Sequence, residues 1–263
     1  MPRFAANLSF LFTELPFLDR FEAAARAGFT GVEYHFPYAF PPSEIRARLD
    51  AFNLTAVLHN IAPGDSAKGE FGLACLPGRE ADFYSAVAQA IDYAEALGTK
   101  RINCLAGVPP AGADLRACEA TLIANLRHTA RACGRAGITL TVEPLNHFDV
   151  PGFFLTTSAR TIAILDAVGE PNAMLQYDFY HMHRMGDDLA ATLTQLLPRI
   201  GHIQFADAPG RNEPGTGVID FAKLFAHIDA IGYAGWVAAE YRPKESTAES
   251  LAWMATSRHA KTA

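Results

Sequence analysis

Short apolar runs alternate with amphipathic helical stretches along the whole chain, and this alternation restricts the possible folds more than any other feature. Eight apolar runs predict strands, at residues 3–10, 31–36, 54–60, 101–107, 137–143, 173–178, 199–207 and 235–240. Eight stretches predict helices, at residues 16–28, 41–53, 79–97, 114–136, 157–168, 187–197, 219–230 and 246–257. Strands that alternate with helices form parallel sheets, so eight such units predict an α/β protein with a closed (β/α)8 TIM barrel.

The sequence also predicts a single domain over residues 1–263, because no linker, charge block or low-complexity tract interrupts the pattern. An open, doubly wound sheet is the structural alternative. A dinucleotide-binding version of it is disfavoured because no Gly-x-Gly-x-x-Gly follows the first strand.

Charge and composition exclude several classes of partner. The net charge is −6 and Lys and Arg do not cluster, which argues against a nucleic-acid partner. No apolar run reaches the length of a membrane span, and the N-terminus reads as a strand rather than a signal peptide. The four cysteines lack C-x-x-C spacing, so we expect reduced thiols in a cytoplasmic protein. The apolar loop stretches are consistent with a homo-oligomer.

Each of the last four predicted strands ends in or near a polar residue whose face would point into the barrel. These residues are Glu143, Asp178, Gln204 and Glu240. Barrel enzymes build their sites at the carboxyl ends of the strands. One such acid is often a helix cap or a salt-bridge partner, but three converging carboxylates must shift their pKa values or gather a cation. Carboxylate and amide oxygens favour Mg²⁺ or Mn²⁺ over zinc, so we predict that these four residues form such a metal site.

Glu143 and Glu240 come from strands that are well separated around the ring, so they could flank a substrate lying across the mouth. One would remove a proton from carbon and the other would return it. A divalent ion would stabilise the enediolate formed between the two steps. Metal binding lowers the basicity of a carboxylate, although a monodentate ligand keeps one oxygen free to act as the base.

Long stretches of the chain resemble the hydroxypyruvate isomerase family, within the xylose isomerase-like TIM barrels. They are "MPRFAANLSFLFTE", "APGD", "LPGRE", "VEPLNHFDVPGFFL", "DFYHM", "RIGHIQFADAPGRNEPGTG" and "GWVAAEYRP". The resemblance implies that Glu143 and Glu240 are the proton donor and acceptor. It also implies that metal-bound relatives use the positions of Glu143, Asp178, Gln204 and Glu240. The sequence departs from the family's usual pattern at His147 and Phe148, where Thr and Arg are expected.

The activity implied by this resemblance is the interconversion of hydroxypyruvate and tartronate semialdehyde through an enediol(ate). The expected partner is therefore a small hydroxy-keto acid. Closely similar sequences act instead on 2-oxo-tetronates, which are four-carbon sugar acids, and related barrels are ketose epimerases. The residues themselves leave these alternatives open.

Four further residues are predicted to bind the substrate. His181 follows the sixth strand in what we expect to be a loop, and the resemblance implies contact with the substrate or a metal-bound water; the alternative is a histidine bonded to backbone. Arg211 offers a planar fork for a substrate carboxylate, with a loop salt bridge to Glu213 as the alternative. His59 and Asn60 end the third strand and are expected at the mouth.

Two other features near the mouth are less specific. His35 ends the second strand, and a structural role is the simpler interpretation. The connection over residues 61–78 is long for a compact domain, and its Phe71 and Leu73 could close over the mouth as a lid. A docked surface loop or a subunit contact is the alternative.

Two rival functions remain on this scaffold. A zinc-cluster endonuclease for damaged DNA would need more histidines at the strand ends and a basic groove. A barrel that only binds metal or serves as a scaffold has no physical reason to keep the constellation of four polar residues.

Overall fold

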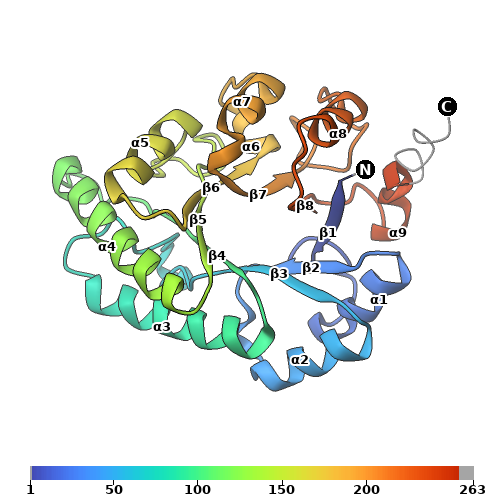
Figure 1. Cartoon of the computed structure of the whole chain (residues 1–263), viewed down its shortest axis with the longest axis horizontal. Coiled ribbons are helices and arrows are strands. Elements are labelled where there is room, and N and C mark those ends of the chain that lie inside the picture. The colour runs from blue at the N-terminus through green and yellow to red at the C-terminus, as the bar shows by residue number, and fades with distance from the viewer. Residues whose placement is uncertain (1, 255–263) are drawn as a thin grey trace.

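The computed structural model describes residues 2–254, in which eight parallel strands close into a barrel in chain order with helices around the outside (Figure 1). The strands are β1 (Arg3–Asn7), β2 (Gly31–Tyr34), β3 (Thr55–Asn60), β4 (Arg101–Cys104), β5 (Thr139–Val142), β6 (Ala173–Asp178), β7 (Ile200–Phe205) and β8 (Trp236–Ala239). The ring closes where β1 pairs with β8. The predicted TIM barrel is confirmed, and the open doubly wound sheet is wrong.

Nine α-helices lie within the described residues. They are α1 (Arg20–Arg26), α2 (Pro42–Ala51), α3 (Glu80–Leu97), α4 (Leu115–Arg135), α5 (Ser158–Val168), α6 (Phe179–Arg184), α7 (Leu189–Leu196), α8 (Phe221–Ala230) and α9 (Thr247–Ser250). Four short 3-10 helices are η1 (Phe17–Asp19), η2 (Pro37–Ala39), η3 (Ser66–Lys68) and η4 (Leu197–Arg199). None of these helices is long and apolar enough to cross a membrane.

Two helices differ from the sequence prediction. The segment after β6 is the helix α6 rather than a loop, because the carboxylate of Asp178 caps it by accepting a hydrogen bond from the Tyr180 backbone N at 2.7 Å. At the C-terminal end, α9 covers Thr247–Ser250 of the predicted helix 246–257, and residues 252–254 are helical again after a turn at Leu251. Residues 255–257 lie outside the described residues.

Successive side chains of each strand point alternately outward, toward the helices, and inward, into the barrel. Outward side chains such as Leu140, Val142 and Phe205 are fully buried beneath the helices. Burying a side chain of this size contributes about 1.5–3 kcal/mol. The inward side chains are polar but equally buried, and they include Asn7, Glu33, Asn103, Thr141, Gln176, His202 and Gln204. The interior of this barrel is therefore a hydrogen-bonded network beneath the mouth, and buried polar groups of this kind need partners.

The indole of Trp236 fills the amino-terminal end of the barrel. The guanidinium of Arg3 lies 4.2 Å from the centre of its ring. Gly31 makes room for it, since a Cβ at that position would lie 2.7 Å from the indole. Apolar packing around Trp236 therefore occupies this end of the barrel, and the polar interior lies toward the carboxyl ends of the strands.

The connection over residues 61–78 is docked against the end of β4. Leu73 is buried in the main core, so the prediction that it belongs to a lid is wrong. Gly72 lies so close to the backbone that a Cβ there would be 2.5 Å from the Leu105 carbonyl oxygen. Phe71 is partly exposed, and the centre of its ring lies 6.1 Å from the centre of the Phe153 ring. A lid role for Phe71 stays a prediction.

Candidate active site

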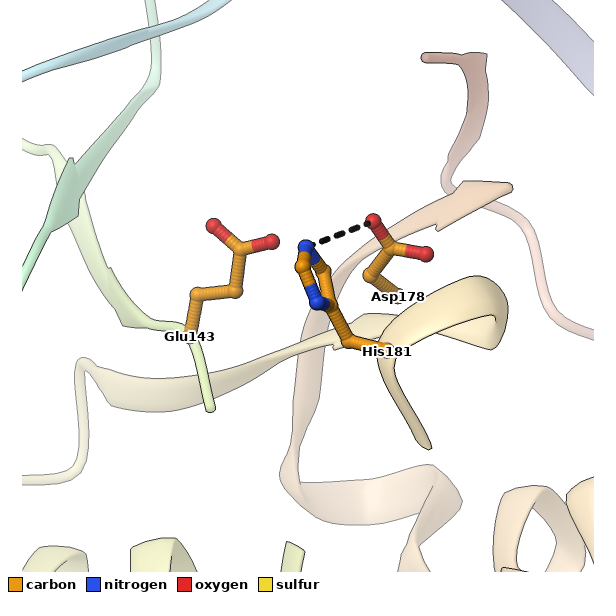
Figure 2. A group of neighbouring side chains, drawn as sticks. All are labelled: Glu143, Asp178 and His181. Atoms are coloured by element: carbon orange, nitrogen blue, oxygen red, sulfur yellow. Dashed lines mark ion pairs between the residues drawn. The ribbon is translucent and has the colours of Figure 1, made fainter. Parts of the chain in front are cut away.

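Two carboxylates and a histidine converge at the carboxyl ends of β5 and β6 (Figure 2). Glu143 directly follows β5, Asp178 ends β6, and His181 lies one turn later on α6. One ligand atom from each residue lies within 4.8 Å of the other two, and all three side chains are buried. The sequence predicted that Glu143 and Asp178 would lie close together at the strand ends, and the barrel brings them together. His181, which was predicted to follow the sixth strand in a loop, joins them from α6.

Three atoms of this cluster have no hydrogen-bond partner within the described residues: Glu143 Oε1, Asp178 Oδ2 and His181 Nε2. The last two are 3.8 Å apart. An unsatisfied buried polar group costs about 1–3 kcal/mol, and more if it is charged. Two buried carboxylate oxygens with unused lone pairs are the donor set that a hard divalent cation prefers, so the residues present fit Mg²⁺ or Mn²⁺.

Burial raises the pKa of both carboxyl groups in the cluster. The pKa of Glu143 lies well above its ordinary value, because burial and the negative charges of Glu240 and Asp178 disfavour ionisation. Burial likewise raises the pKa of Asp178 to about 7, and the charge of Arg211 limits this rise. Without a cation, both carboxyl groups of the cluster therefore bind a proton more tightly than a carboxyl group in water does.

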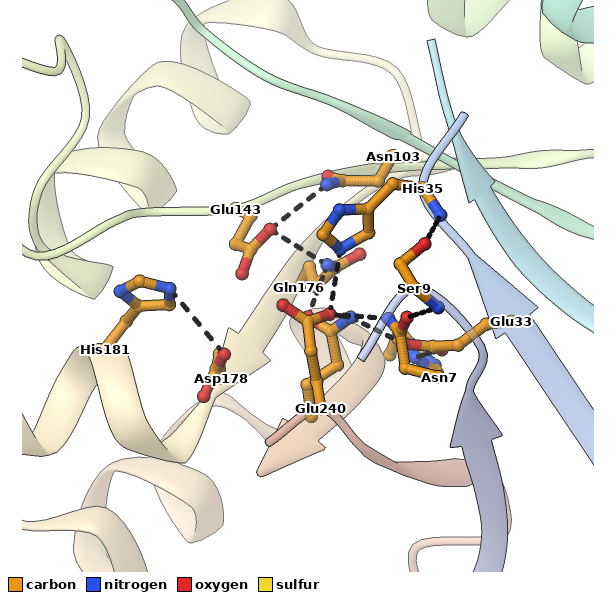
Figure 3. Close-up of polar contacts among 12 residues, drawn as sticks. Asn7, Ser9, Glu33, His35, Asn103, Glu143, Gln176, Asp178, His181 and Glu240 are labelled. Carbon is orange, nitrogen blue, oxygen red and sulfur yellow. Dashed lines mark hydrogen bonds and ion pairs between the residues drawn. The ribbon is translucent and has the colours of Figure 1, made fainter. Parts of the chain in front are cut away.

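Glu240 follows β8 and has the opposite electrostatics, because four donors surround it. Two of them, Asn7 and His35, are labelled in Figure 3. Its Oε2 accepts hydrogen bonds from Asn7 Nδ2 at 2.8 Å and Gln204 Nε2 at 2.5 Å, and it lies 3.4 Å from His35 Nε2. Its Oε1 accepts one from Arg211 Nη2 at 2.6 Å. Burial alone would raise the pKa of Glu240, but His35 and Arg211 outweigh it and lower the pKa below its ordinary value. Two acids whose pKa values move apart are suited to act as an acid and a base.

Gln204 joins the two sides of the site. Its NH₂ group donates to Glu33 Oε1 at 2.7 Å and to Glu240 Oε2, and its oxygen accepts from Gln176 Nε2 at 2.6 Å. The two carboxylates fix this orientation, since an amide oxygen turned toward them would be repelled. To bind a metal through its oxygen, Gln204 would have to give up its bond from Gln176. Its predicted role as a ligand stays a prediction.

Arg211 reaches the site from the loop after β7. Its guanidinium lies between the rings of Phe10 and Tyr180, 4.8 and 5.2 Å from their centres. Its Nη2 bonds Glu240 and lies 3.9 Å from Asp178 Oδ2. The alternative of an ion pair with Glu213 is not what the structure shows. A partly buried planar cation beside two carboxylates is well placed to receive a substrate carboxylate.

His59 is not at the mouth, and the prediction that it binds substrate is wrong. Its Nε2 is 3.0 Å from the Ala90 carbonyl oxygen on α3, outside the barrel, and burial lowers its pKa to about 4. Consecutive strand residues face opposite sides, so His59 and Asn60 cannot both point inward. Asn60 pairs in register with Asn103, which donates to Glu143 at 3.2 Å. A substrate contact for Asn60 stays a prediction.

Among the interior residues that the sequence analysis did not single out are Asn7, Glu33 and His202, and His35, which lies 3.4 Å from Glu240, was given a structural role. Glu33 accepts hydrogen bonds from Asn7 Nδ2 at 2.9 Å and from His202 Nε2 at 2.6 Å. The alternation that placed the later strand ends would also have found Glu33 and His35, because they share one face of the second strand. The alternation was applied only to the last four strands, so Glu33 on the second strand was not recognised.

A closed parallel barrel with buried carboxylates at its carboxyl ends defines a class of TIM-barrel enzymes whose chemistry takes place at the mouth. The chain belongs to the xylose isomerase-like TIM barrel family, whose model matches residues 21–257.

Two named relatives and one solved structure are similar to the chain over nearly its whole length. The chain is 50% identical to hydroxypyruvate isomerase of Escherichia coli (strain K12), over 97% of this chain and 98% of the relative. It is 47% identical to 2-oxo-tetronate isomerase of Cupriavidus necator, over the same shares of the two chains. A crystal structure named AP endonuclease, family 2, from Brucella melitensis superposes with a TM-score of 0.95 at 42% identity, covering 97% of this chain and 99% of that one. The two isomerase matches support an isomerase activity for this chain.

Proposed function

We propose that the chain interconverts hydroxypyruvate and tartronate semialdehyde, as an intramolecular oxidoreductase of the aldose–ketose type. The observation that carries the proposal is the pair of buried glutamates at one mouth, Glu143 and Glu240, whose pKa values move in opposite directions. The E. coli relative named hydroxypyruvate isomerase supports the choice of substrate.

The two glutamates divide the proton transfer. Glu240, held ionised by its donors, removes a proton from C3 of hydroxypyruvate and leaves an enediolate. The hydroxyl proton on O3 passes to O2, and Glu143 delivers its proton to C2, which gives the aldehyde at C3. The two carboxyl groups exchange protonation states in each turnover, and solvent restores them.

The neighbouring residues hold the substrate. Arg211 exchanges its bond with Glu240 for one with the substrate carboxylate, which frees Glu240 Oε1 to accept the proton. His181 Nε2 faces the same volume and is free to bond a substrate oxygen. The buried site keeps water away from the enediolate.

The proposed cofactor is Mg²⁺ or Mn²⁺. Glu143 and Asp178 would hold it through their unpartnered oxygens, and Glu240 and Gln204 are the further predicted ligands. When bound, it would stabilise negative charge on the two substrate oxygens. A cytoplasmic location and assembly into a homo-oligomer stay predictions.

A 2-oxo-tetronate isomerase is the second candidate. The observation in its favour is the 47% identity to the C. necator relative of that name, which spans as much of the chain as the first match does. The same pair of glutamates would perform the same proton transfer on a substrate with one more carbon.

A zinc-cluster endonuclease has less support, although the B. melitensis structure carries the name AP endonuclease, family 2. Within residues 2–254, the group of at least three His, Cys, Asp or Glu ligands that could hold an ion contains a single histidine. The net charge of −6 also does not favour DNA binding.

The test is to measure kcat/KM for hydroxypyruvate and for a 2-oxo-tetronate by proton NMR of the products, with Mg²⁺ or Mn²⁺ added. We expect Glu240→Gln to lower kcat/KM about 100-fold or more, because the base is lost. His59→Gln is the matched control, since His59 is equally buried but faces α3. Higher kcat/KM for the four-carbon acid would select the second candidate, and conversion of neither acid would refute both.

A further inference from the structure

Asn146, in the loop after β5, places two N–H groups against one nitrogen of the catalytic-site histidine. Its backbone N is 3.1 Å from His181 Nδ1, and its side-chain Nδ2 is 2.8 Å from the same atom. Both residues are buried. A backbone N–H can only donate, so Nδ1 must present a lone pair to it.

The orientation of the Asn146 side-chain amide is also fixed. Its Oδ1 accepts hydrogen bonds from the backbone N of Phe148 at 3.1 Å and of Asp149 at 2.9 Å. Two backbone donors require the oxygen at that position, so the NH₂ group must face His181. The side-chain assignment therefore does not depend on the histidine.

These contacts determine where His181 carries its hydrogen. A neutral imidazole with a lone pair on Nδ1 has its hydrogen on Nε2, and a protonated ring would carry one there too. Nε2 is thus a donor in either charge state. It is the nitrogen that lies 3.8 Å from Asp178 Oδ2 and has no hydrogen-bond partner within the described residues.

We propose that Asn146 is a positioning residue that keeps His181 Nε2 a hydrogen-bond donor to the substrate oxygen on which negative charge develops. This rests on the proposed function. The same tautomer removes His181 from the set of metal ligands, because a nitrogen that carries a hydrogen cannot bind a cation. The cluster of Glu143, Asp178 and His181 then offers a cation oxygen atoms only, which favours Mg²⁺ or Mn²⁺ over zinc.

Asn146 could instead serve only to anchor its loop, and the two roles use different atoms. The oxygen anchors the loop through Phe148 and Asp149, and the NH₂ group faces the histidine. Asn146→Asp keeps the shape and the anchoring oxygen, but puts an acceptor where Nδ2 stood. Asn172→Asp is the matched control, because Asn172 donates to the Ala130 and Ile138 carbonyl oxygens at the opposite end of the barrel.

The experiment is a two-bond ¹H–¹⁵N correlation spectrum of protein labelled with ¹⁵N-histidine, which reports which ring nitrogen carries the hydrogen. His181→Gln identifies the His181 signals by their loss. We expect wild type and Asn172→Asp to show hydrogen on Nε2 only. We expect Asn146→Asp to show hydrogen on Nδ1, because a charge-assisted hydrogen bond to the new carboxylate is stronger than the bond from the backbone N–H of residue 146 that it displaces. We expect kcat/KM for the substrate to fall about 10- to 100-fold in Asn146→Asp and to stay near wild type in Asn172→Asp.

Hydrogen on Nδ1 in the wild type would overturn the proposal. So would an Asn146→Asp variant that loses stability or activity while its tautomer stays unchanged, because that is the signature of an anchor alone. If neither acid is converted, the proposed function fails, yet the spectrum still decides the tautomer of His181.

Discussion

The acid cluster should make the metal-free protein less stable as the pH rises. Burial raises the pKa of Asp178 to about 7 from an ordinary value of 3.8. The folded chain therefore binds this proton more tightly than the unfolded chain does, and the free energy of unfolding falls between pH 3.8 and about 7. At about 1.4 kcal/mol per pH unit, the full loss is about 4 kcal/mol, and it persists above pH 7.

Asp178→Asn removes this titration and keeps the helix cap, because an Asn oxygen can also accept from the Tyr180 N–H. In a chelator, we expect the variant to match wild type near pH 4 and to exceed its free energy of unfolding by about 4 kcal/mol at pH 8. Adding Mg²⁺ at about a hundred times its Kd should stabilise wild type by about 2.7 kcal/mol, and the variant less.

Urea unfolding at several pH values, followed by circular dichroism, measures these differences. Asp166→Asn is the control, because Asp166 pairs with Arg199 at the exposed surface and its loss should shift stability little at any pH. An Asp178→Asn variant that is no more stable than wild type at pH 8 would refute the reasoning.

Three further substitutions test single contacts of the site. Gln204→Glu should lower the free energy of unfolding by about 3–5 kcal/mol, because a carboxylate then faces Glu33 and Glu240. An unchanged free energy of unfolding in urea would contradict this expectation. Arg211→Lys should raise KM about 10-fold with a smaller change in kcat, because lysine lacks the planar fork; steady-state kinetics with unchanged KM would mean that Arg211 serves only Glu240. His59→Gln should keep kcat/KM close to wild type, since the side chain bonds α3, and a clear fall would restore its predicted substrate contact.

The barrel could be predicted because the sequence shows both the alternation of apolar and polar residues typical of strands and the apolar spacing typical of helices. Runs such as 137–143 alternate Leu140 and Val142 outward with Thr141 and Glu143 inward, and the intervening stretches have helical spacing. Eight repeats of this unit leave few arrangements other than a closed parallel barrel. The same alternation brought Glu143, Asp178, Gln204 and Glu240 to one end of the structure.

The details that the sequence did not predict depend on contacts between distant residues. Nothing near Gln204 in the sequence reveals that Glu33 and Glu240 would turn its NH₂ group inward. The helix α6 was missed because its start depends on the Asp178 cap rather than on an apolar pattern. His59 was a different kind of error, since the sequence already placed it on the face opposite Asn60.

The central claim is that Glu143 and Glu240 move a proton between two carbons. The most direct test follows hydroxypyruvate by proton NMR in D₂O with wild type and with Glu240→Gln. If two separate carboxyl groups exchange their protons with solvent, the wild-type product should carry deuterium at C2. Glu240→Gln should abolish both the turnover and the incorporation of deuterium. Conversion by wild type without deuterium would mean that the same hydrogen moves from C3 to C2 without exchange, which would contradict transfer by two separate carboxyl groups.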